Sequence, residues 1–172
     1  MHIEQSGEPV GEVVSFELVK KHCRVDPDYE DDLILQALEA AIEWVQDTCS
    51  TVFLKTEFTA TGQDFCLSFK GYPYPEVHSI TYVDRLGVPG EITDWSISGG
   101  RLVIDHAPEV EAATVVFTAG FGAGNVPKKL IRAIMMLAAY WNGQRESGSK
   151  EPMADVPMGV SAMIAHHRSP VF

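Results

Sequence analysis

The sequence predicts an α+β fold, in which a helical scaffold carries an antiparallel β insert and ends in a mobile C-terminal segment. Apolar residues recur at helical spacing before residue 50 and after residue 125. Residues 53–119 instead hold short β-type runs separated by Gly, Pro and Asp, with connections too short for a crossover helix. We expect one domain over residues 15–147, a flexible arm over 1–14, and a linker with a short docking helix over 148–172.

Two helices are predicted in the first part of the chain, over residues 15–23 and 28–49. Ser15 is positioned to cap the first helix, and Asp28 to cap the second, whose first turn is acidic as the helix dipole favours. Trp44 lies beside the apolar stripe of the second helix and is interpreted as a core aromatic. The stripe consists of Ile34, Leu38, Ala41, Val45 and Cys49.

A third helix is predicted over residues 126–145. Asn125 is its expected cap, and Pro127 falls in the first turn, where a missing N–H costs nothing. Trp141 is interpreted as a second core aromatic. It belongs to an apolar face formed by Leu130, Ile131, Ile134, Leu137, Ala138 and Trp141.

The β insert is predicted to have five to six strands. The candidate runs are "TEFTATG", "DFCLSF", "SITYVD", "WSISGGRLVID" and "ATVVFTA". Gly99-Gly100 is typical of a two-residue hairpin turn. The two prolines of "GYPYPEV" place that stretch in a connection or at a sheet edge.

The stretch "FTAGFGAGNVPKKL" places three glycines between a strand and a helix, as in many phosphate-binding loops. Its chemistry does not fit, because no hydroxyl follows the lysines, the spacing is GxGxG, and Pro127 removes a helix-start N–H. We therefore interpret this stretch as a structural joint and keep a nucleotide site over Gly120–Gly124 as a minor alternative. The joint residues are Gly120, Gly122, Gly124, Asn125 and Pro127.

Nothing in the sequence indicates an enzyme, a metal site or a cofactor. Cys23, Cys49 and Cys66 are odd in number and lack CxxC spacing, so buried free thiols are expected. The adjacent His166 and His167 point to different faces of a helix and do not form a metal-binding pair. No nucleophile motif is recognisable, although groups brought together only in space would leave no sequence signature.

The net charge of −11 is unevenly distributed along the chain. It is −9 over residues 1–50, −5 over 51–125 and +3 over 126–172. Such an acidic chain does not grip nucleic acid through phosphates, and its charge asymmetry favours either solubility alone or self-assembly. We find no signal peptide or membrane-spanning run, and expect synthesis in a cytoplasm.

The order of these pieces resembles the head–tail connector proteins of tailed bacteriophages over nearly the whole chain from residue 14. The resemblance lies in "VSFELVKKHCRVDPDYEDDLILQALEAAIEWVQDTCSTVFL", "SITYVDRLGV", "VVFTAGFGAGNVPKKLIRAIMMLAAYWNGQRE" and "VPMGVSAMIAHHR". Two positions depart from the family pattern: Ser50 stands where Gly is frequent, and His167 where Tyr is frequent. The residues that match are Lys20 or Lys21, His22, Arg24, Val25, Asp26, Asp31, Asp32, Ala40, Ala41, Trp44, Gly120, Gly122, Pro127, Ala133, Ile134, Trp141, Arg145, Pro157, Gly159, Val160 and Arg168.

The resemblance implies a non-enzymatic virion protein, made in a bacterial host and located at the head–tail interface of a phage, prophage or gene transfer agent. Such connectors form a ring, usually twelvefold, beneath the portal protein and extend the channel through which DNA passes. They also contact the next neck or tail-completion protein. A stopper or tail-completion role is the alternative. For portal docking the expected residues are Met158, Gly159, Val160, Met163, Ile164 and Arg168.

Overall fold

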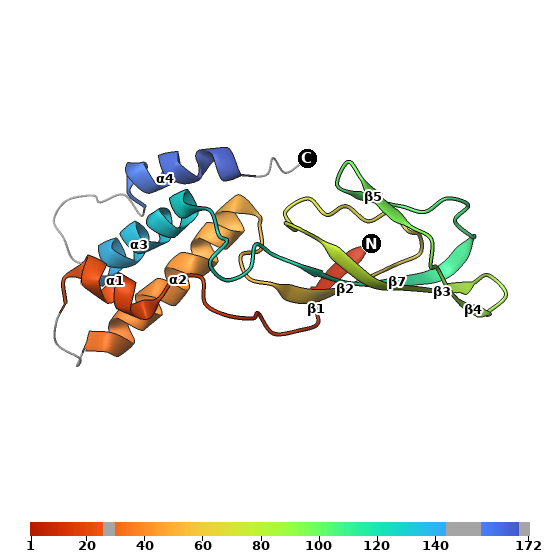
Figure 1. Ribbon diagram of the computed structural model, residues 1–172, viewed down its shortest axis with the longest axis horizontal. Helices are drawn as coiled ribbons and strands as arrows, with labels where there is room; N and C mark the ends of the chain where they lie inside the picture. The colour runs from red at the N-terminus through yellow and green to blue at the C-terminus, as the bar shows by residue number, and fades with distance from the viewer. Residues whose placement is uncertain (26–29, 144–155, 169–172) are drawn as a thin grey trace. The chain divides into compact units, whose positions relative to one another are not determined.

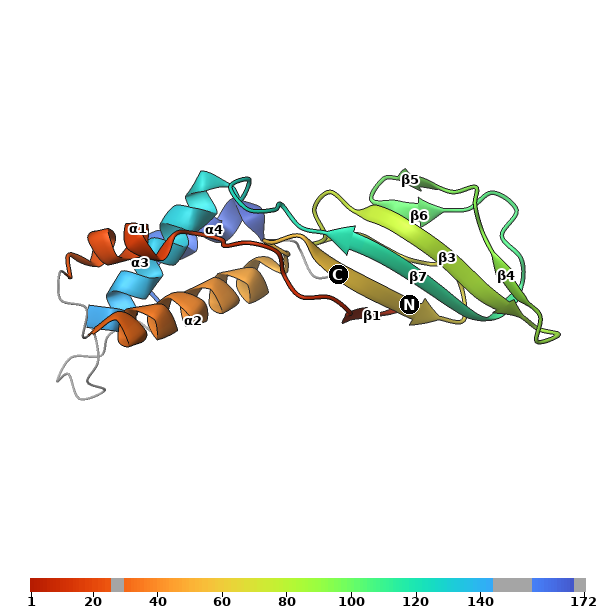
Figure 2. The ribbon, with the colours of Figure 1, turned by 60° about the horizontal axis from the view of Figure 1, so that its bottom comes forward.

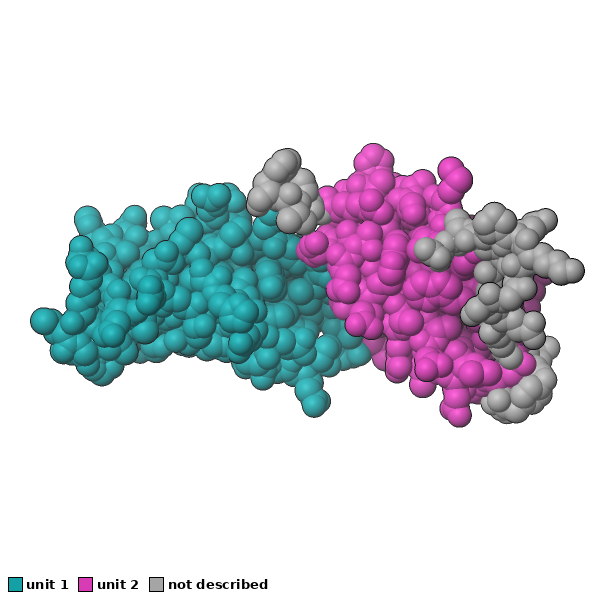
Figure 3. Space-filling model, turned by 180° about the vertical axis from the view of Figure 1, so that it is seen from behind, with its two compact units in different colours: residues 1–11, 51–122 teal, residues 12–50, 123–172 magenta. Residues whose placement is uncertain are grey.

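The computed structural model describes residues 1–25, 30–143 and 156–168. Within it the chain forms two compact units (Figures 1 and 3), where the sequence led us to expect one domain. Unit 1 comprises residues 1–11 and 51–122, and unit 2 comprises residues 12–50 and 123–172. Each unit is therefore assembled from two segments that are far apart in the sequence.

Unit 1 is built on a five-stranded antiparallel sheet with the order β1-β2-β7-β3-β4 (Figure 2). The longest strand, β7 (Val110–Ala119), lies in the centre between β2 and β3. The other strands are β1 (His2–Gln5), β2 (Thr56–Gly62), β3 (Glu76–Asp84) and β4 (Pro89–Glu91). A separate hairpin consists of β5 (Ser96–Ser98) and β6 (Arg101–Val103).

One face of the sheet carries an aromatic core. Phe58 of β2 and Phe117 of β7 stack with ring centroids 5.5 Å apart, and Phe69 and Tyr72 approach Phe117 edge-on. Such pairs contribute about 0.5–1.5 kcal/mol beyond the burial of their area. The buried residues of this core are Phe58, Ala60, Leu67, Phe69, Ile80, Leu102, Val115, Phe117 and Ala119.

The strand predictions are confirmed in number and direction: six antiparallel strands lie between residues 56 and 119. Gly99 and Gly100 form the hairpin turn, with φ of 58° and 72°. Two local predictions were wrong. "DFCLSF" makes only an isolated bridge between Ser68 and Arg101 and covers the core with Leu67 and Phe69. The expected flexible arm contains β1, an edge strand whose largely exposed residues leave no apolar alternation to detect.

Unit 2 is helical. Its helices are α1 (Phe16–Cys23), α2 (Asp31–Cys49), α3 (Lys128–Gly143) and α4 (Met158–Ile164), followed by a single 3-10 turn, η2 (Ala165–His167). The helices α2 and α3 run antiparallel, so that the end of α2 lies beside the start of α3 (Figures 1 and 2). The predicted stripe of α2 is buried in full: Ile34, Leu38, Ala41, Val45 and Cys49.

The helix boundaries were predicted within a few residues. Ser15 is the N-cap residue of α1, although its side chain makes no capping hydrogen bond. The second helix begins at Asp31, with Glu30 as the preceding residue, while the predicted cap Asp28 and the motif residue Arg145 lie outside the described residues. No helix in the described ranges combines the length and apolarity needed to cross a membrane.

Trp44 and Trp141 correct the prediction of core aromatics. Both are half-buried, so they flank the helical core instead of filling it. Trp44 projects from α2 to one side of the buried stripe, and a side chain as large as Trp is seldom covered completely. The fully buried residues of unit 2 come from all four helices and are aliphatic apart from Cys49.

Candidate assembly surfaces

The glycine loop is held by backbone hydrogen bonds that use two of its N–H groups. Gly120 donates its N–H to the carbonyl of Pro73 at 2.8 Å, and Gly122 donates to the carbonyl of Phe53 at 3.0 Å. A phosphate loop presents unpaired N–H groups to its ligand. Here two of the candidate donors, those of Gly120 and Gly122, are already used within unit 1.

Gly120 is required sterically. Its φ is +132°, and a Cβ atom placed there would lie 2.1 Å from the carbonyl oxygen of Leu54 and 2.9 Å from the nitrogen of Lys55. Gly122 and Gly124 also have positive φ, at 84° and 77°, but a Cβ on Gly124 would meet open space. Gly120 therefore permits the close approach between the end of β7 and the residues before β2.

Pro127, and not the predicted residue Asn125, occupies the cap position of α3. Its carbonyl accepts hydrogen bonds from Leu130 and Ile131, and the first helical residue is Lys128. Proline fits here because its fixed φ suits a helix start and the first N–H groups of a helix have no intrahelical partner. Asn125 lies two residues earlier, in the turn.

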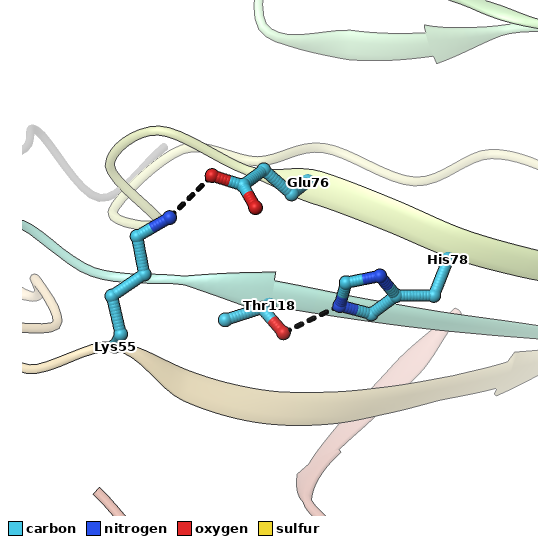
Figure 4. Close-up of polar contacts among 4 residues, drawn as sticks. All are labelled: Lys55, Glu76, His78 and Thr118. Carbon is cyan, nitrogen blue, oxygen red and sulfur yellow. Dashed lines mark hydrogen bonds and ion pairs between the residues drawn. The ribbon is translucent and has the colours of Figure 1, made fainter. Parts of the chain in front are cut away.

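A polar cluster connects three strands of unit 1 near the glycine loop (Figure 4). Lys55, before β2, donates a hydrogen bond to the carboxylate of Glu76 on β3. His78 of β3 and Thr118 of β7 are joined by a hydrogen bond of 2.6 Å between Nε2 and Oγ1. The ladder between β3 and β7 shifts at Val77/Ser79, so His78 is the extra residue of a bulge.

The contacts of this cluster are of a kind that stabilises the sheet. The hydrogen bond from Lys55, and after it the lysine charge, lower the pKa of Glu76, which keeps the carboxylate ionised. A hydroxyl beside an imidazole also resembles a nucleophile and its base. Within the described residues, however, no carboxylate bonds the other ring nitrogen of His78, as a catalytic triad requires.

A metal site and a ligand-binding groove are likewise poorly supported by the described residues. No group of three His, Cys, Asp or Glu residues that could hold a metal occurs in the part of the chain that the structure describes. An open groove of about 440 Å³ runs over β3, β4 and β7, but Glu91 is the one carboxylate among the residues that line it. Its lining consists of Thr81, Tyr82, Val83, Pro89, Gly90, Glu91, Ala112 and Thr114.

The three cysteines are free, as predicted, but they differ in burial. Cys49 is buried and Cys23 half-buried, and burial raises the pKa of both thiols, offset at Cys49 by the charge of Arg168. Cys66 is exposed, which corrects the expectation that all three thiols are buried. It lies in the irregular segment whose core contact is made by the following residue, Leu67.

The six predicted docking residues, in α4 and the turn after it, differ in burial. Val160 and Ile164 are fully buried, since α4 packs on α3 of its own chain. Met158 is 86% exposed, and Gly159 and Arg168 are also exposed. The apolar side of α4 is thus already covered by its own unit. Met163 is half-buried.

The outer faces of α2 and α3 carry opposite charge. Glu39, Glu43 and Asp47 of α2 are exposed, and α2 contains no basic residue. The residues Lys128, Lys129 and Arg132 of α3 are exposed, and α3 contains no acidic residue. Surfaces of this kind are candidates for protein–protein contact.

Comparison with known proteins finds one family model and several solved structures that resemble this chain. Residues 14–71 match the family model described as "Phage gp6-like head-tail connector protein". Among solved structures, a chain in the neck of an empty gene transfer agent (GTA) particle, computed with C6 symmetry, is 22% identical with a TM-score of 0.76, covering 100% of this chain and 97% of the other. A chain in the virion of a native GTA particle gives 22% identity and a TM-score of 0.75, with the same coverage.

A chain in the neck of a native GTA particle, computed with C12 symmetry, gives 24% identity and a TM-score of 0.66, with 96% of each chain covered. No protein with a curated description matches the chain. The resemblance inferred from the sequence is thereby confirmed: residues 14–71 match the phage gp6-like head–tail connector family, and the whole chain has the fold of chains from the necks and virion of GTA particles.

Proposed function

We propose that this chain is a non-enzymatic structural protein of the neck of a phage-like particle. It forms a ring under the portal, joins head to tail and extends the channel through which DNA leaves. It is made in the bacterial cytoplasm and becomes part of the virion. The observation that carries the proposal is the agreement of fold along the full length of both chains with proteins of GTA necks.

Two further findings support a structural role. The connector match covers residues 14–71 and thus reaches from α1 and α2 into unit 1. Ion pairs of the described residues hold neighbouring elements together: Lys55, just before β2, pairs with Glu76 of β3, and Lys20 of α1 pairs with Asp31 of α2 at 2.7 Å. A ring of identical subunits needs two different complementary patches on each copy, and the charges of α2 and α3 provide such a pair.

The contact with the portal is a narrower proposal. The exposed residues of α4 and its following turn, Met158, Gly159 and Arg168, are available for it. Val160 and Ile164 would contribute only if α4 left α3, which would expose two fully buried side chains. We therefore assign the portal contact to the exposed residues and leave the apolar side of α4 on its own subunit.

Electron microscopy and mass measurement of the purified protein, alone and with its portal, test the proposal. We expect rings, or particles in which the protein caps the portal. A protein that stays monomeric and ignores its portal would contradict the connector role. A stopper or tail-completion protein would bind another neck protein and not the portal. Thermal stabilisation by a nucleotide or divalent metal would instead support a binding site at the glycine loop.

A further inference from the structure

The acidic face of α2 points away from the core of unit 2. Glu39, Glu43 and Asp47 follow one another at four-residue steps, so they form one stripe along the helix. This stripe lies on the side opposite the buried residues, because Glu39, Glu43 and Asp47 each lie two positions before a buried residue, and two residues of an α-helix turn by about 200°. All three side chains are exposed, and none forms an ion pair within residues 1–25, 30–143 and 156–168.

The basic residues of α3 also lie on the side of their helix opposite its buried residues. Lys128 and Arg132 are one turn apart, and Lys129 lies next to them. The residues that α3 buries, from Leu130 to Ala138, face the other way. None of the three basic side chains has an ion-pair partner among the described residues.

These charges oppose the local preference of both helices. Acidic residues stabilise the start of a helix and basic residues its end. Here Asp47 lies in the last turn of α2, which has no basic residue, and Lys128 and Lys129 lie in the first turn of α3, which has no acidic residue. A local conflict of this kind at both sites indicates that the charges serve a contact outside the helix.

The placement of the two faces suits a heterologous contact between copies. The helices pack on each other through their buried sides, so their charged outer faces lie on opposite sides of the helix pair. Because α2 and α3 are antiparallel, the end of α2 lies beside the start of α3 (Figure 2). Asp47 lies in the last turn of α2, and Lys128 is the first residue of α3. A rotation from one copy to the next would therefore bring acid opposite base.

We propose that the acidic face of α2 on one copy binds the basic face of α3 on the next copy and so forms the subunit contact of the ring. This inference rests on the proposed function. Apolar side chains beside the charges add area to the contact: Leu33 and Leu35 of α2 are 46% and 42% exposed, and Met135 and Ala139 of α3 are half-buried. The opposite charges then set the register of the contact and exclude pairing of like faces.

A pair of charge-reversed variants tests the contact. The acid-reversed variant carries Glu39→Lys, Glu43→Lys and Asp47→Lys, and the base-reversed variant carries Lys128→Glu, Lys129→Glu and Arg132→Glu. The new lysine at the end of α2 and the new glutamates at the start of α3 have the charges that the helix dipole favours, so neither variant should lose helix stability. A control variant with Asp94→Lys, Asp105→Lys and Glu111→Lys changes the net charge as the acid-reversed variant does, at exposed positions of unit 1.

Sedimentation velocity and native mass spectrometry of the full chain provide the measurement. Each reversed variant alone should associate about ten-fold more weakly or worse, since like charges then meet at every contact. An equimolar mixture of the two should recover assemblies with alternating subunits, because each α2 again faces an α3 of opposite charge. Wild-type assembly should weaken between about 0.05 M and about 0.5 M salt.

The possible results distinguish a failure of the proposed subunit contact from a failure of the proposed ring. Reversed variants that assemble alone as well as the wild type and the control would overturn the inference while the ring stands, and so would a mixture that fails to recover. A wild type that stays monomeric even with its portal would overturn the proposed function and the inference with it. A gel-shift experiment with a short DNA duplex tests whether the basic face binds DNA. If only the base-reversed variant loses DNA binding while its assembly stays intact, the basic face is a DNA-binding surface and the inference is overturned.

Discussion

Replacing Gly120 with alanine should strongly destabilise unit 1. A backbone with φ of +132° costs a non-glycine residue about 1–3 kcal/mol. The new Cβ would also lie 2.1 Å from the carbonyl oxygen of Leu54, so one backbone must move. That movement strains the hydrogen bond from Gly120 to Pro73, which contributes about 1 kcal/mol. The backbone strain and the weakened hydrogen bond together cost about 2–4 kcal/mol, and the displacement of the backbone adds to this cost.

Gly87→Ala is the matched control, because Gly87 also lies in unit 1 with a positive φ of +80° but has nothing within 4 Å of a Cβ. We expect it to cost about 1–2 kcal/mol. For a chain of this length each kcal/mol lowers Tm by about 2–4 °C, so differential scanning calorimetry should separate the two variants. If Gly120→Ala melts no lower than Gly87→Ala, the close approach to Leu54 does not restrict this position as argued.

Three further predictions concern charge, thiols and α4. The lowered pKa of Glu76 means that its stabilising effect is present above its ordinary pKa of about 4.5 and is lost as pH falls through the lower folded value. Glu76→Gln should therefore be less stable than wild type in urea at neutral pH and equal to it in strong acid; a constant difference would argue against the ion pair. Cys66 should react rapidly with a thiol reagent and Cys49 only on unfolding, and equal rates would contradict their different burial. Ile164→Ala should cost about 2–5 kcal/mol in the isolated protein, against less than about 0.5 kcal/mol for the exposed Met158→Ala; equal values would show that α4 does not pack on α3.

Most secondary structure could be predicted because its signals are local. The buried stripe of α2 repeats at three and four residues, and the hairpin at Gly99-Gly100 needs two residues that accept positive φ. Both signals lie within one element. The prediction of β1 failed because His2–Gln5 form an exposed edge strand, which gains its hydrogen bonds from β2, more than 50 residues away.

The assembly surfaces could be predicted only in part from the sequence. The charge asymmetry between the first 50 residues and the last 47 was visible, but not its concentration on the outer faces of two packed helices. The apolar residues of α4 were assigned to a partner, since a short amphipathic segment gives no indication of what covers it. Val160 and Ile164 proved to be buried within their own unit.

The sequence by itself determined the α+β class, the helical periods, the turn residues and the resemblance to connectors, because each depends on residues that are neighbours along the chain. The tertiary structure decided the sheet order, the two-unit division, the burial of α4 and the need for glycine at position 120. These features depend on distances between remote segments. Gly120 lies against Leu54, and no pattern within either segment records that approach.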